Sequence, residues 1–168
     1  MDIKNCELSD IDDIVTLYKN AIAYQKTKKC AVWPMFSAND ITLAINEKRQ
    51  FKIIIDNKTA CIFTFTFQDK SIWGDKDQND AVYIHKVATA ANFKGKNLVN
   101  ELIIFSKKYA KKHSKLFLRM DTVGENTGLI DYYTKCGFTF LGLNKLTSFT
   151  DLPKHYHNAT VSLFELQI

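Results

Sequence analysis

One segment constrains the fold more than any other, because it reads as a strand, a helix and a second strand in direct succession. Residues 81–89 and 116–122 are apolar runs of the kind found in buried strands. Between them, residues 96–112 repeat apolar side chains at the spacing of an amphipathic helix. A helical crossover joins parallel strands of one sheet, so this segment predicts a parallel pair with a central position.

The rest of the chain adds elements in the overall order β-α-α-β-β-β-α-β-α-β-β. Further strands are expected at residues 3–7, 51–56, 60–68, 138–143 and 160–167. Further helices are expected at residues 9–25, 37–47 and 126–136. Ser9 is the expected N-cap of the first helix, and Ser37 with Asp40 predicts a capping box on the second. Residues 56–59 favour a hairpin turn, and the polar residues 69–79 favour a loop.

Length and composition predict one domain with a full core. The chain has 168 residues, 46% of them hydrophobic, and we expect residues 1–168 to form a single domain. Its four cysteines are widely spaced and show no metal-binding pattern with histidine. The N-terminus lacks the apolar run of a signal peptide, and no apolar run reaches the roughly 18 residues of a membrane span. These features predict a cytoplasmic protein that does not bind a membrane.

The charge favours a small anionic ligand over nucleic acid. The net charge is +5, but only Arg49 and Arg119 among the 23 basic residues are arginines. Arginine forks that read bases and phosphates are therefore scarce. The densest basic run, residues 107–115, ends the long helix, where lysine complements the negative end of the helix dipole. No nucleic-acid partner is predicted.

A cationic turn precedes the long helix. Asn92, Lys94, Gly95 and Lys96 lie where that helix begins. A helix N-terminus presents unpaired N–H groups and the positive end of its dipole, which together stabilise a phosphate. Gly95 removes the side chain that would hold a phosphate away from the backbone. An ordinary solvated helix cap is the alternative, and these residues taken alone favour that cap over a phosphate site.

Three segments of this chain resemble motifs of the GNAT superfamily of acyl-CoA N-acyltransferases. Residues 85–89, His-Lys-Val-Ala-Thr, are similar to the family's fourth strand. Residues 92–97, Asn-Phe-Lys-Gly-Lys-Asn, resemble its Gln/Arg-x-x-Gly-x-Gly/Ala pyrophosphate loop, with Asn92 in place of Gln or Arg and Asn97 in place of Gly or Ala. Residues 126–138 resemble its Asn-then-Tyr-x-x-x-Gly-Phe signature.

The resemblance implies both a fold and a cofactor. The implied fold is a mixed α/β (α+β) domain whose mostly antiparallel sheet has about seven strands, flanked by about four helices, with strands 81–89 and 116–122 as its parallel pair. Acetyl-CoA is expected where these two strands splay apart, with its pantetheine amides added to the sheet like a strand. The implied cofactor-binding residues are Val87, Ala88, Thr89, Asn92, Phe93, Lys94, Gly95, Lys96, Asn97, Leu98, Asn126 and Tyr133. Core packing for Val87 and Thr89, and helix capping for Asn126, are the alternatives.

The resemblance also implies an acid and a base. An alkylammonium has a pKa near 10, so a base or a water chain must take its proton before it attacks a thioester. His85 is the candidate base, because its unperturbed pKa of about 6.5 suits neutral pH. Tyr83, on the same strand face, is expected to hold a relaying water. A histidine hydrogen-bonded at the sheet surface is the equal alternative. Tyr133 is the candidate acid for the departing CoA thiolate, with a core aromatic as its alternative.

The acceptor pocket is expected between the N-terminal helices and the late loop. Tyr24, Trp33 and Phe36 are the candidate lining residues besides Tyr83, and core packing is the alternative for all of them. His155, Tyr156 and His157 are placed to reach the pocket mouth. No carboxylate or cysteine near these two histidines completes a metal site, so no metal is predicted.

The leading hypothesis is therefore an acetyl-CoA-dependent N-acetyltransferase that acts directly on a primary amine of a small molecule or peptide. A catalytically silent acyl-CoA-binding module is the alternative, and the presence of both His85 and Tyr133 favours the enzyme. A nucleic-acid binder is disfavoured by the scarcity of arginine. The acceptor is left open, and a homodimer is one possible assembly.

Overall fold

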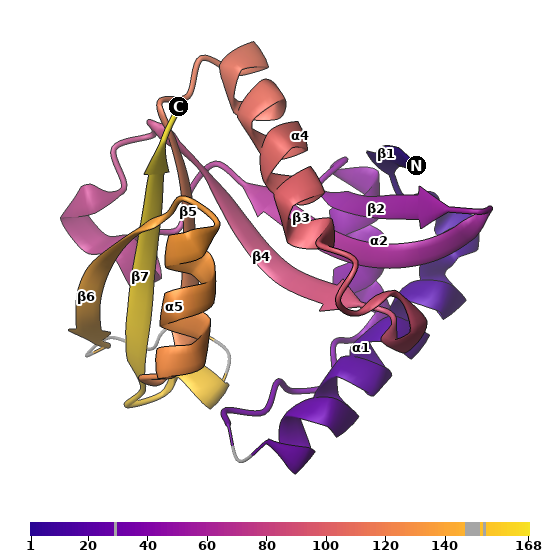
Figure 1. Cartoon of the computed structure of the whole chain (residues 1–168), viewed down its shortest axis with the longest axis horizontal. Helices are drawn as coiled ribbons and strands as arrows, with labels where there is room; N and C mark the ends of the chain where they lie inside the picture. Colours follow the sequence, from indigo (N-terminus) through magenta and orange to yellow (C-terminus); the bar gives the residue numbers. More distant parts are fainter. Residues whose placement is uncertain (29, 147–151, 153) are drawn as a thin grey trace.

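The computed structural model describes residues 1–28, 30–146, 152 and 154–168, and Figure 1 shows its arrangement. The strands are β1 (Asp2–Asn5), β2 (Gln50–Ile55), β3 (Lys58–Thr66), β4 (Ala81–Thr89), β5 (Phe117–Val123), β6 (Thr139–Lys145) and β7 (Thr160–Gln167). The α-helices are α1 (Ile11–Thr27), α2 (Ala38–Asn46), α3 (Lys70–Trp73), α4 (Leu98–Lys112) and α5 (Thr127–Lys135). Single turns of 3-10 helix are η1 (Leu8–Asp10), η2 (Gly74–Lys76), η3 (Ala91–Phe93) and η4 (Lys154–Tyr156).

The seven strands form one sheet in the order β1-β2-β3-β4-β5-β7-β6. Strands β4 and β5 pair in parallel, and every other neighbouring pair in this described sheet is antiparallel. Helix α4 provides the crossover between the parallel strands. The structure thus confirms the predicted mixed sheet and its parallel pair.

The helices cover the two faces of the sheet, because successive residues of a strand point to opposite sides. On β3, Phe63 belongs to the apolar cluster under α4, whereas its neighbour Ile62 packs with residues of α1 and α2. Figure 1 shows α4 and α5 on the near side of the sheet. We call the α4/α5 side the first face, and the side of α1 and α2 the second face.

Strands β4 and β5 separate after a short paired stretch. Their register runs from Ala81 opposite Phe117 only as far as Tyr83 opposite Arg119. Beyond that point β4 remains paired with β3, and β5 with β7, while the two parallel strands diverge in Figure 1. Within the described sheet, the inner edges of both strands are therefore open to a ligand between them.

A bulge in β4 lies at this opening. Ile62 pairs with Ala88 and Thr64 with His85, so Lys86 and Val87 together face the single residue Phe63. Lys86 has a φ of 54°, in the left-handed region, and this backbone conformation lets the strand accommodate the extra residue. The bulge lets His85 and Ala88 both point to the second face, while Val87 packs against the core of the first.

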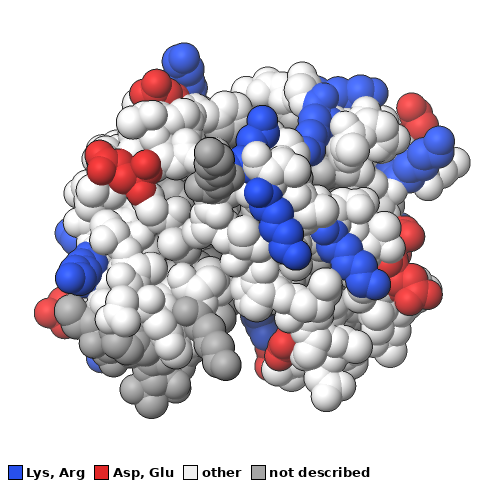
Figure 2. Space-filling view, turned by 90° about the horizontal axis from the view of Figure 1, so that it is seen from below, with Lys and Arg blue, Asp and Glu red and all other residues white. Residues whose placement is uncertain are grey.

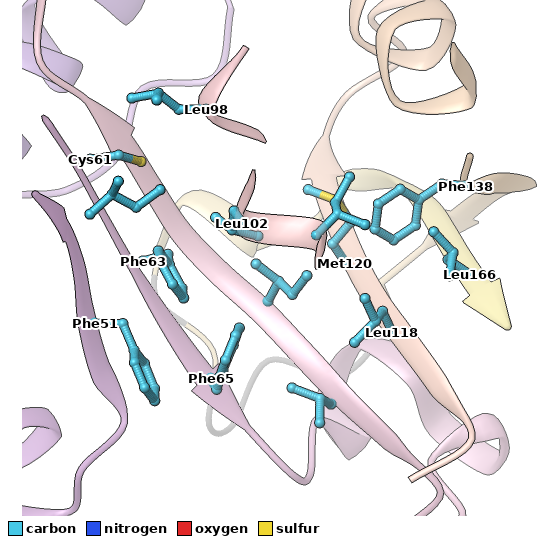
Figure 3. Close-up of a cluster of buried hydrophobic side chains, with 14 of the residues drawn as sticks. Phe51, Cys61, Phe63, Phe65, Leu98, Leu102, Leu118, Met120, Phe138 and Leu166 are labelled. Atoms are coloured by element: carbon cyan, nitrogen blue, oxygen red, sulfur yellow. The ribbon is translucent and has the colours of Figure 1, made fainter. Parts of the chain in front are cut away.

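The larger core fills the first face (Figure 3). Phe51 of β2 and Phe63 and Phe65 of β3 point to the same side, with ring centroids 5.5 Å apart for Phe51–Phe63 and 4.9 Å for Phe51–Phe65. Leu98 and Leu102 of α4 contribute to the same buried cluster. Burying a large apolar side chain contributes about 1.5–3 kcal/mol, so this aromatic cluster fixes α4 against β2 and β3.

A buried arginine links β4, β5 and β7 on the second face. Arg119 is 4% exposed. Its Nε donates to Glu165 at 2.7 Å, and its Nη1 donates to Asp80 at 2.8 Å and to the Tyr83 hydroxyl at 3.2 Å. Nη1 also donates to the carbonyl of Lys76 at 2.8 Å. One guanidinium thus ties the start of the parallel pair to the loop before it.

Several sequence-based details differ from the structure. Residues 69–79 contain α3 and η2, so the prediction of a plain loop there was wrong, and the helix number is five where about four were expected. Ser9 does not cap α1, because it lies inside η1 and Asp10 takes the N-cap position. The Ser37–Asp40 capping box and the hairpin at Asp56 are confirmed.

None of the helices that the structure describes is long and apolar enough to cross a lipid bilayer.

Candidate functional site

The cationic turn before α4 uses two left-handed residues. Gly95 has a φ of 77° and Asn97 a φ of 58°, and Asn97 is the N-cap of α4. Asn tolerates this region better than other residues with a side chain, which explains how Asn97 occupies a position where the family motif has Gly or Ala. The turn therefore keeps the backbone shape of a glycine-rich loop at the start of a helix of 15 residues.

The side chains of this turn do not all face solvent. Phe93 and Leu98 are buried in the core under α4, at 6% and 5% exposure, so their side chains do not reach a phosphate. The N–H of Phe93 already donates to the carbonyl of Ala90 at 2.9 Å, which leaves the N–H groups at the start of α4 as the candidate donors. Lys94 Nζ lies 3.3 Å from the ring centre of Tyr24 at the end of α1, and Lys96 Nζ lies 5.0 Å from that of Phe93. The predicted cofactor loop and the predicted acceptor residue Tyr24 thus touch.

Figure 2 views the end of the molecule toward which β4 and β5 diverge. Lysine and arginine side chains gather across the middle of this face, and a notch cuts into its lower edge. The positive charge therefore lies where the strands open, as binding of a polyphosphate requires.

Replacing Gly95 tests the phosphate site. A Cβ at Gly95 would meet no atom within 4 Å, but its φ of 77° strains any L side chain. We therefore expect Gly95→Ala to cost about 1 kcal/mol of folding free energy while acetyl-CoA still binds. Gly95→Glu adds bulk and a like charge, and should weaken acetyl-CoA binding well beyond the Ala variant in calorimetry. Equal affinities for the two variants would remove the phosphate site from this turn.

Helix α5 carries the motif residues Asn126 and Tyr133. The Asn126 side chain accepts a hydrogen bond from the N–H of Leu129 at 3.1 Å, which confirms the capping alternative. Tyr133 packs on Phe164 and Phe138, with ring centroids at 5.3 Å and 6.2 Å. It also lines a small apolar pocket with Ile84 and others at the opening between the parallel strands. Burial raises the pKa of Tyr133, which keeps the phenol protonated.

The second face of the opening holds three titratable groups. His85 of β4 and Asp121 of β5 each lie two residues beyond the last paired residues of these strands. His85 Nε2 lies 3.4 Å from Asp69 Oδ2, and His85 Nδ1 lies 3.8 Å from Asp121 Oδ1. We call Asp69, His85 and Asp121 the acidic triad. The imidazole therefore stands between two carboxylates, on the side of the sheet opposite Tyr133.

Burial shifts all three pKa values in the acidic triad. It lowers the pKa of His85 to about 4. Burial, followed by the negative charges of Asp121 and Asp77, raises the pKa of Asp69 to about 8. Burial raises the pKa of Asp121 to about 6, against a hydrogen bond from Tyr156 that favours its ionised form. The expectation of an ordinary histidine pKa at His85 was therefore wrong, because burial keeps the imidazole neutral.

The raised pKa of Asp69 predicts a stability that depends on pH. Its folded value of about 8 exceeds the unfolded value of 3.8, so the folded state holds the proton more tightly. Stability from this group is complete below the unfolded value and is lost as pH rises toward the folded one. Asp69→Asn has no such proton. We therefore expect the unfolding free energy of the variant, relative to the parent, to increase between about pH 5 and about pH 8 in urea titrations. A constant difference would contradict the shift.

Tyr83 supports the acidic triad without lining an open space. Its side chain is fully buried, and its hydroxyl donates to Asp77 at 3.0 Å and accepts from Arg119 at 3.2 Å. The structure therefore does not support the expected role of Tyr83 in holding a water for the acceptor. Asp77 Oδ2 in turn accepts from the backbone N–H of Asp69 at 2.8 Å, so this hydrogen-bonded chain positions the triad.

The late segment reaches the triad through η4. The Tyr156 hydroxyl donates to Asp121 Oδ2 at 3.0 Å, and the Nδ1 of His155 is buried with no hydrogen-bond partner among the described residues. His157, which is exposed, contacts the carbonyl of Leu152 at 3.1 Å. Residues 147–151 and 153 of the predicted late loop lie outside the described residues.

Trp33 and Phe36 form an aromatic group with Tyr18 on the second face. The centroid distances are 6.2 Å for Tyr18–Trp33, 4.6 Å for Tyr18–Phe36 and 5.8 Å for Trp33–Phe36. Both are partly buried and pack against the core of α1 and α2, which fits the core alternative. Phe36 also lies under Lys86, with Nζ 4.5 Å from the ring centre, so it adjoins the bulge next to His85.

Among the remaining cofactor predictions, the strand residues are the best placed. Val87 packs on the first-face core and Ala88 on the second, so their backbone lies at the open edge while their side chains hold the layers together. The Thr89 hydroxyl donates to Cys61 Sγ at 3.5 Å. Asn92 lies in η3 just before the turn. A broad groove between residues 70–76 and 141–146 contains none of the predicted site residues.

Sequence reasoning missed Asp69 and Asp121. Asp121 stood inside an apolar run expected to be a central strand, and a charged residue there signals either a partner or a function. The triad offers three ligand atoms within 4.8 Å of one another, of types that Zn²⁺ accepts. In the arrangement seen, however, the two ring nitrogens of His85 face different carboxylates, so the donors do not converge on one point.

Comparison with known proteins agrees with these motifs. Residues 44–138 match the model of the acetyltransferase (GNAT) family. The uncharacterized N-acetyltransferase YesJ of Bacillus subtilis (strain 168) is 24% identical over 108 residues, which cover 62% of this chain and 60% of YesJ. A streptothricin acetyltransferase from Escherichia coli is 30% identical over 99 residues, which cover 55% of this chain and 54% of that protein. The chain thus spans less than two thirds of the length of either relative.

Solved structures share the fold over nearly the whole chain. A GNAT-family acetyltransferase from Listeria monocytogenes aligns with a TM-score of 0.78 and 19% identity, covering 99% of this chain and 94% of that one. The Salmonella typhimurium protein YncA, solved with its cofactor acetyl-CoA, aligns with a TM-score of 0.71 and 14% identity, covering 99% and 93%. The family match, which includes the bulged strand, the cationic turn and the α5 motif, assigns the chain to the acetyltransferase (GNAT) family.

Proposed function

We propose that this chain, acting as a single domain, transfers an acetyl group from acetyl-CoA directly to a primary amine of a small molecule or peptide. The opening between β4 and β5 carries the proposal, because it brings three requirements of the reaction together. The cationic turn lies where the strands open, Tyr133 lies on the first face, and the acidic triad lies on the second. A thioester in the opening would be reached from both sides.

The cofactor part of the proposal rests on the turn and on β4. The pyrophosphate would bind the N–H groups at the start of α4, next to Lys94 and Lys96. Pantetheine amides would add to the open inner edge of β4 around Val87 and Thr89. The acetyl-CoA in the YncA structure supports this choice of cofactor. Acetyl-CoA supplies the activated acetyl group, and the residues of the chain hold it and manage two protons.

Proton transfer is divided between the two faces. On the second face, the triad around His85 would take a proton from the acceptor amine, which must be neutral to attack. On the first face, Tyr133 would give its proton to the departing thiolate, whose basicity is close to the cysteine value of about 8.5. The raised pKa of Tyr133 fits a group that stays protonated until the thiolate forms.

An amine acceptor is supported by the names of similar proteins. One relative is a streptothricin acetyltransferase, and one structural neighbour is a spermidine N-acetyltransferase from Vibrio cholerae, with a TM-score of 0.66 and 15% identity. The test is a panel of primary amines and peptides incubated with acetyl-CoA, with free thiol as the readout. Thiol release that depends on the amine supports the enzyme. Tight acetyl-CoA binding without such release for any amine would favour a silent acyl-CoA-binding module.

A further inference from the structure

Two buried carboxylate oxygens in the acidic triad lack a hydrogen-bond partner. The Asp121 side chain is 1% exposed, and its Oδ1 is unpaired among the described residues, while Oδ2 accepts from Tyr156. Asp69 Oδ2 is likewise buried and unpaired, on a side chain that is 12% exposed. Burying an unpaired carboxylate oxygen is costly, and such groups persist where they bind a ligand or carry out chemistry.

The acidic triad carries a net charge of −1 near neutral pH. With pKa values of about 8 for Asp69, about 4 for His85 and about 6 for Asp121, one proton is shared among the three groups. If Asp69 holds it, the charges are 0, 0 and −1. If His85 holds it, they are −1, +1 and −1. The total is the same in both cases, so the charge does not depend on where the proton resides.

Neighbouring cations are engaged elsewhere. Arg119, which is buried on this face, pairs with Asp80 and Glu165, and Arg49 pairs with Glu47. Lys86 lies over the ring of Phe36, and the negative charge of Asp40 favours its ammonium form. Among the described residues, no ion pair joins the triad to a lysine or arginine. The triad therefore has no direct ion-pair partner among these residues, and the positive charges of Lys86 and Arg49 act on His85 only from a longer distance.

The position of the triad decides what can neutralise it. The triad lies beside the opening of β4 and β5, on the face opposite Tyr133. An amine that approaches the thioester from the second face would meet its two unpaired oxygens. A primary ammonium has three N–H donors and one positive charge, which matches two free acceptor oxygens and a charge of −1.

We propose that Asp69 and Asp121 bind the ammonium group of the acceptor, and that they select amines with no anionic group beside the reacting nitrogen. This rests on the proposed acetyl transfer. The ammonium R–NH₃⁺ would dock on the two unpaired oxygens and then lose one proton to the triad. The products are the neutral amine R–NH₂ and a triad of zero charge, so protons and charge balance. The amine lone pair then attacks the acetyl carbonyl.

The selectivity follows from repulsion between like charges. In an α-amino acid, the carboxylate is bonded to the carbon that carries the amine, so docking the amine would bring this second anion next to Asp69 and Asp121. Two carboxylates in a partly buried site repel strongly. The corresponding carboxamide has nearly the same shape and no charge. We therefore expect amides to bind roughly 10- to 100-fold more tightly than the corresponding acids. This ratio corresponds to the cost of a like-charge contact at an interface.

Three matched pairs test the proposal: tyrosine and tyrosinamide, tryptophan and tryptophanamide, and arginine and argininamide. Binding to the protein saturated with CoA is followed by calorimetry near pH 7, below the ordinary α-amino pKa of about 7.7. The amide member should bind more tightly in each pair, and Asp121→Asn should bring the ratio of affinities close to one. Asp131→Asn, an exposed acid on α5, is the matched control and should keep the parental ratio.

Equal binding of acid and amide by the parent protein would overturn the proposal, and so would absence of binding by every amide. A ratio that survives both Asp69→Asn and Asp121→Asn would also overturn it. Because binding is read without turnover, these outcomes are separate from the failure of acetyl transfer, which would appear as no amine-dependent thiol release across the amine panel. Melting temperatures of the variants confirm that each is folded.

Discussion

Tyr133→Phe is expected to lower the turnover number by about 10²- to 10⁴-fold, the range typical for loss of general acid catalysis. The substitution keeps the ring that packs on Phe164 and Phe138 and removes only the hydroxyl. Folding and acetyl-CoA affinity should therefore remain close to those of the parent. Steady-state kinetics with an accepted amine give the rate, and calorimetry gives the affinity.

The adjacent Tyr132 provides a matched control, because it lies on the same helix and is 39% exposed. Tyr132→Phe should leave turnover near the parental value. A thioester whose leaving thiol is more acidic needs less help from an acid, so it should reduce the deficit of Tyr133→Phe. Parental turnover by Tyr133→Phe, under conditions where the chemical step limits the rate, would rule out Tyr133 as the acid and leave the family assignment intact.

Arg119→Met is expected to destabilise the protein by about 3–5 kcal/mol, because removing one partner of a buried ion pair leaves its charges unpaired. Arg119 is 4% exposed and holds both Asp80 and Glu165, whose side chains are each 23% exposed. It also donates to the Tyr83 hydroxyl and to the backbone before β4. Urea titration of the parent and the variant measures the change in unfolding free energy.

The second arginine of the chain is the control for this effect. Arg49 pairs with Glu47 on the surface, and these side chains are 34% and 48% exposed. Surface ion pairs contribute about 0–1 kcal/mol, so Arg49→Met should have only a small effect. Adding Asp80→Asn and Glu165→Gln to Arg119→Met should restore part of the stability by removing the stranded charges. A loss no greater than that of Arg49→Met would show that the buried network does not stabilise the sheet.

The parts of the fold that the sequence predicts well are those with a local signal. Residues 81–122 alternate between strand and helix periodicity, so the parallel pair and its crossover helix could be placed before the structure was known. Ser37 with Asp40 satisfied a short-range capping pattern. Residues 70–76, by contrast, form single helical turns whose polar composition resembles a loop. Local propensity carries little information about elements that short, because packing of Ile72 and Trp73 against the second face decides them.

The candidate site divides in the same way. His85 and Tyr133 could be predicted as site residues from their positions in the motifs, but the two carboxylates on either side of His85 could not. Asp69 follows β3 and Asp121 lies on β5, so only the completed sheet brings them together. The histidine pKa was wrong for the same reason, since burial depends on neighbours distant in sequence. The sequence could not show that Tyr83 is a buried supporting residue and not a pocket residue, because its partners Asp77 and Arg119 come from different elements.

Direct transfer can be measured with isotopically labelled acetyl-CoA and any amine that supports thiol release. We expect N-acetylated amine and free CoA to appear in equal amounts, with no acetyl group on the protein at any time by mass spectrometry. Equal amounts follow because each acetyl group transferred releases one CoA. The protein stays free of acetyl because the amine attacks the thioester directly in the opening between β4 and β5. Release of CoA without acetylated amine, or an acetylated protein that forms and decays fast enough to lie on the pathway, would contradict direct transfer.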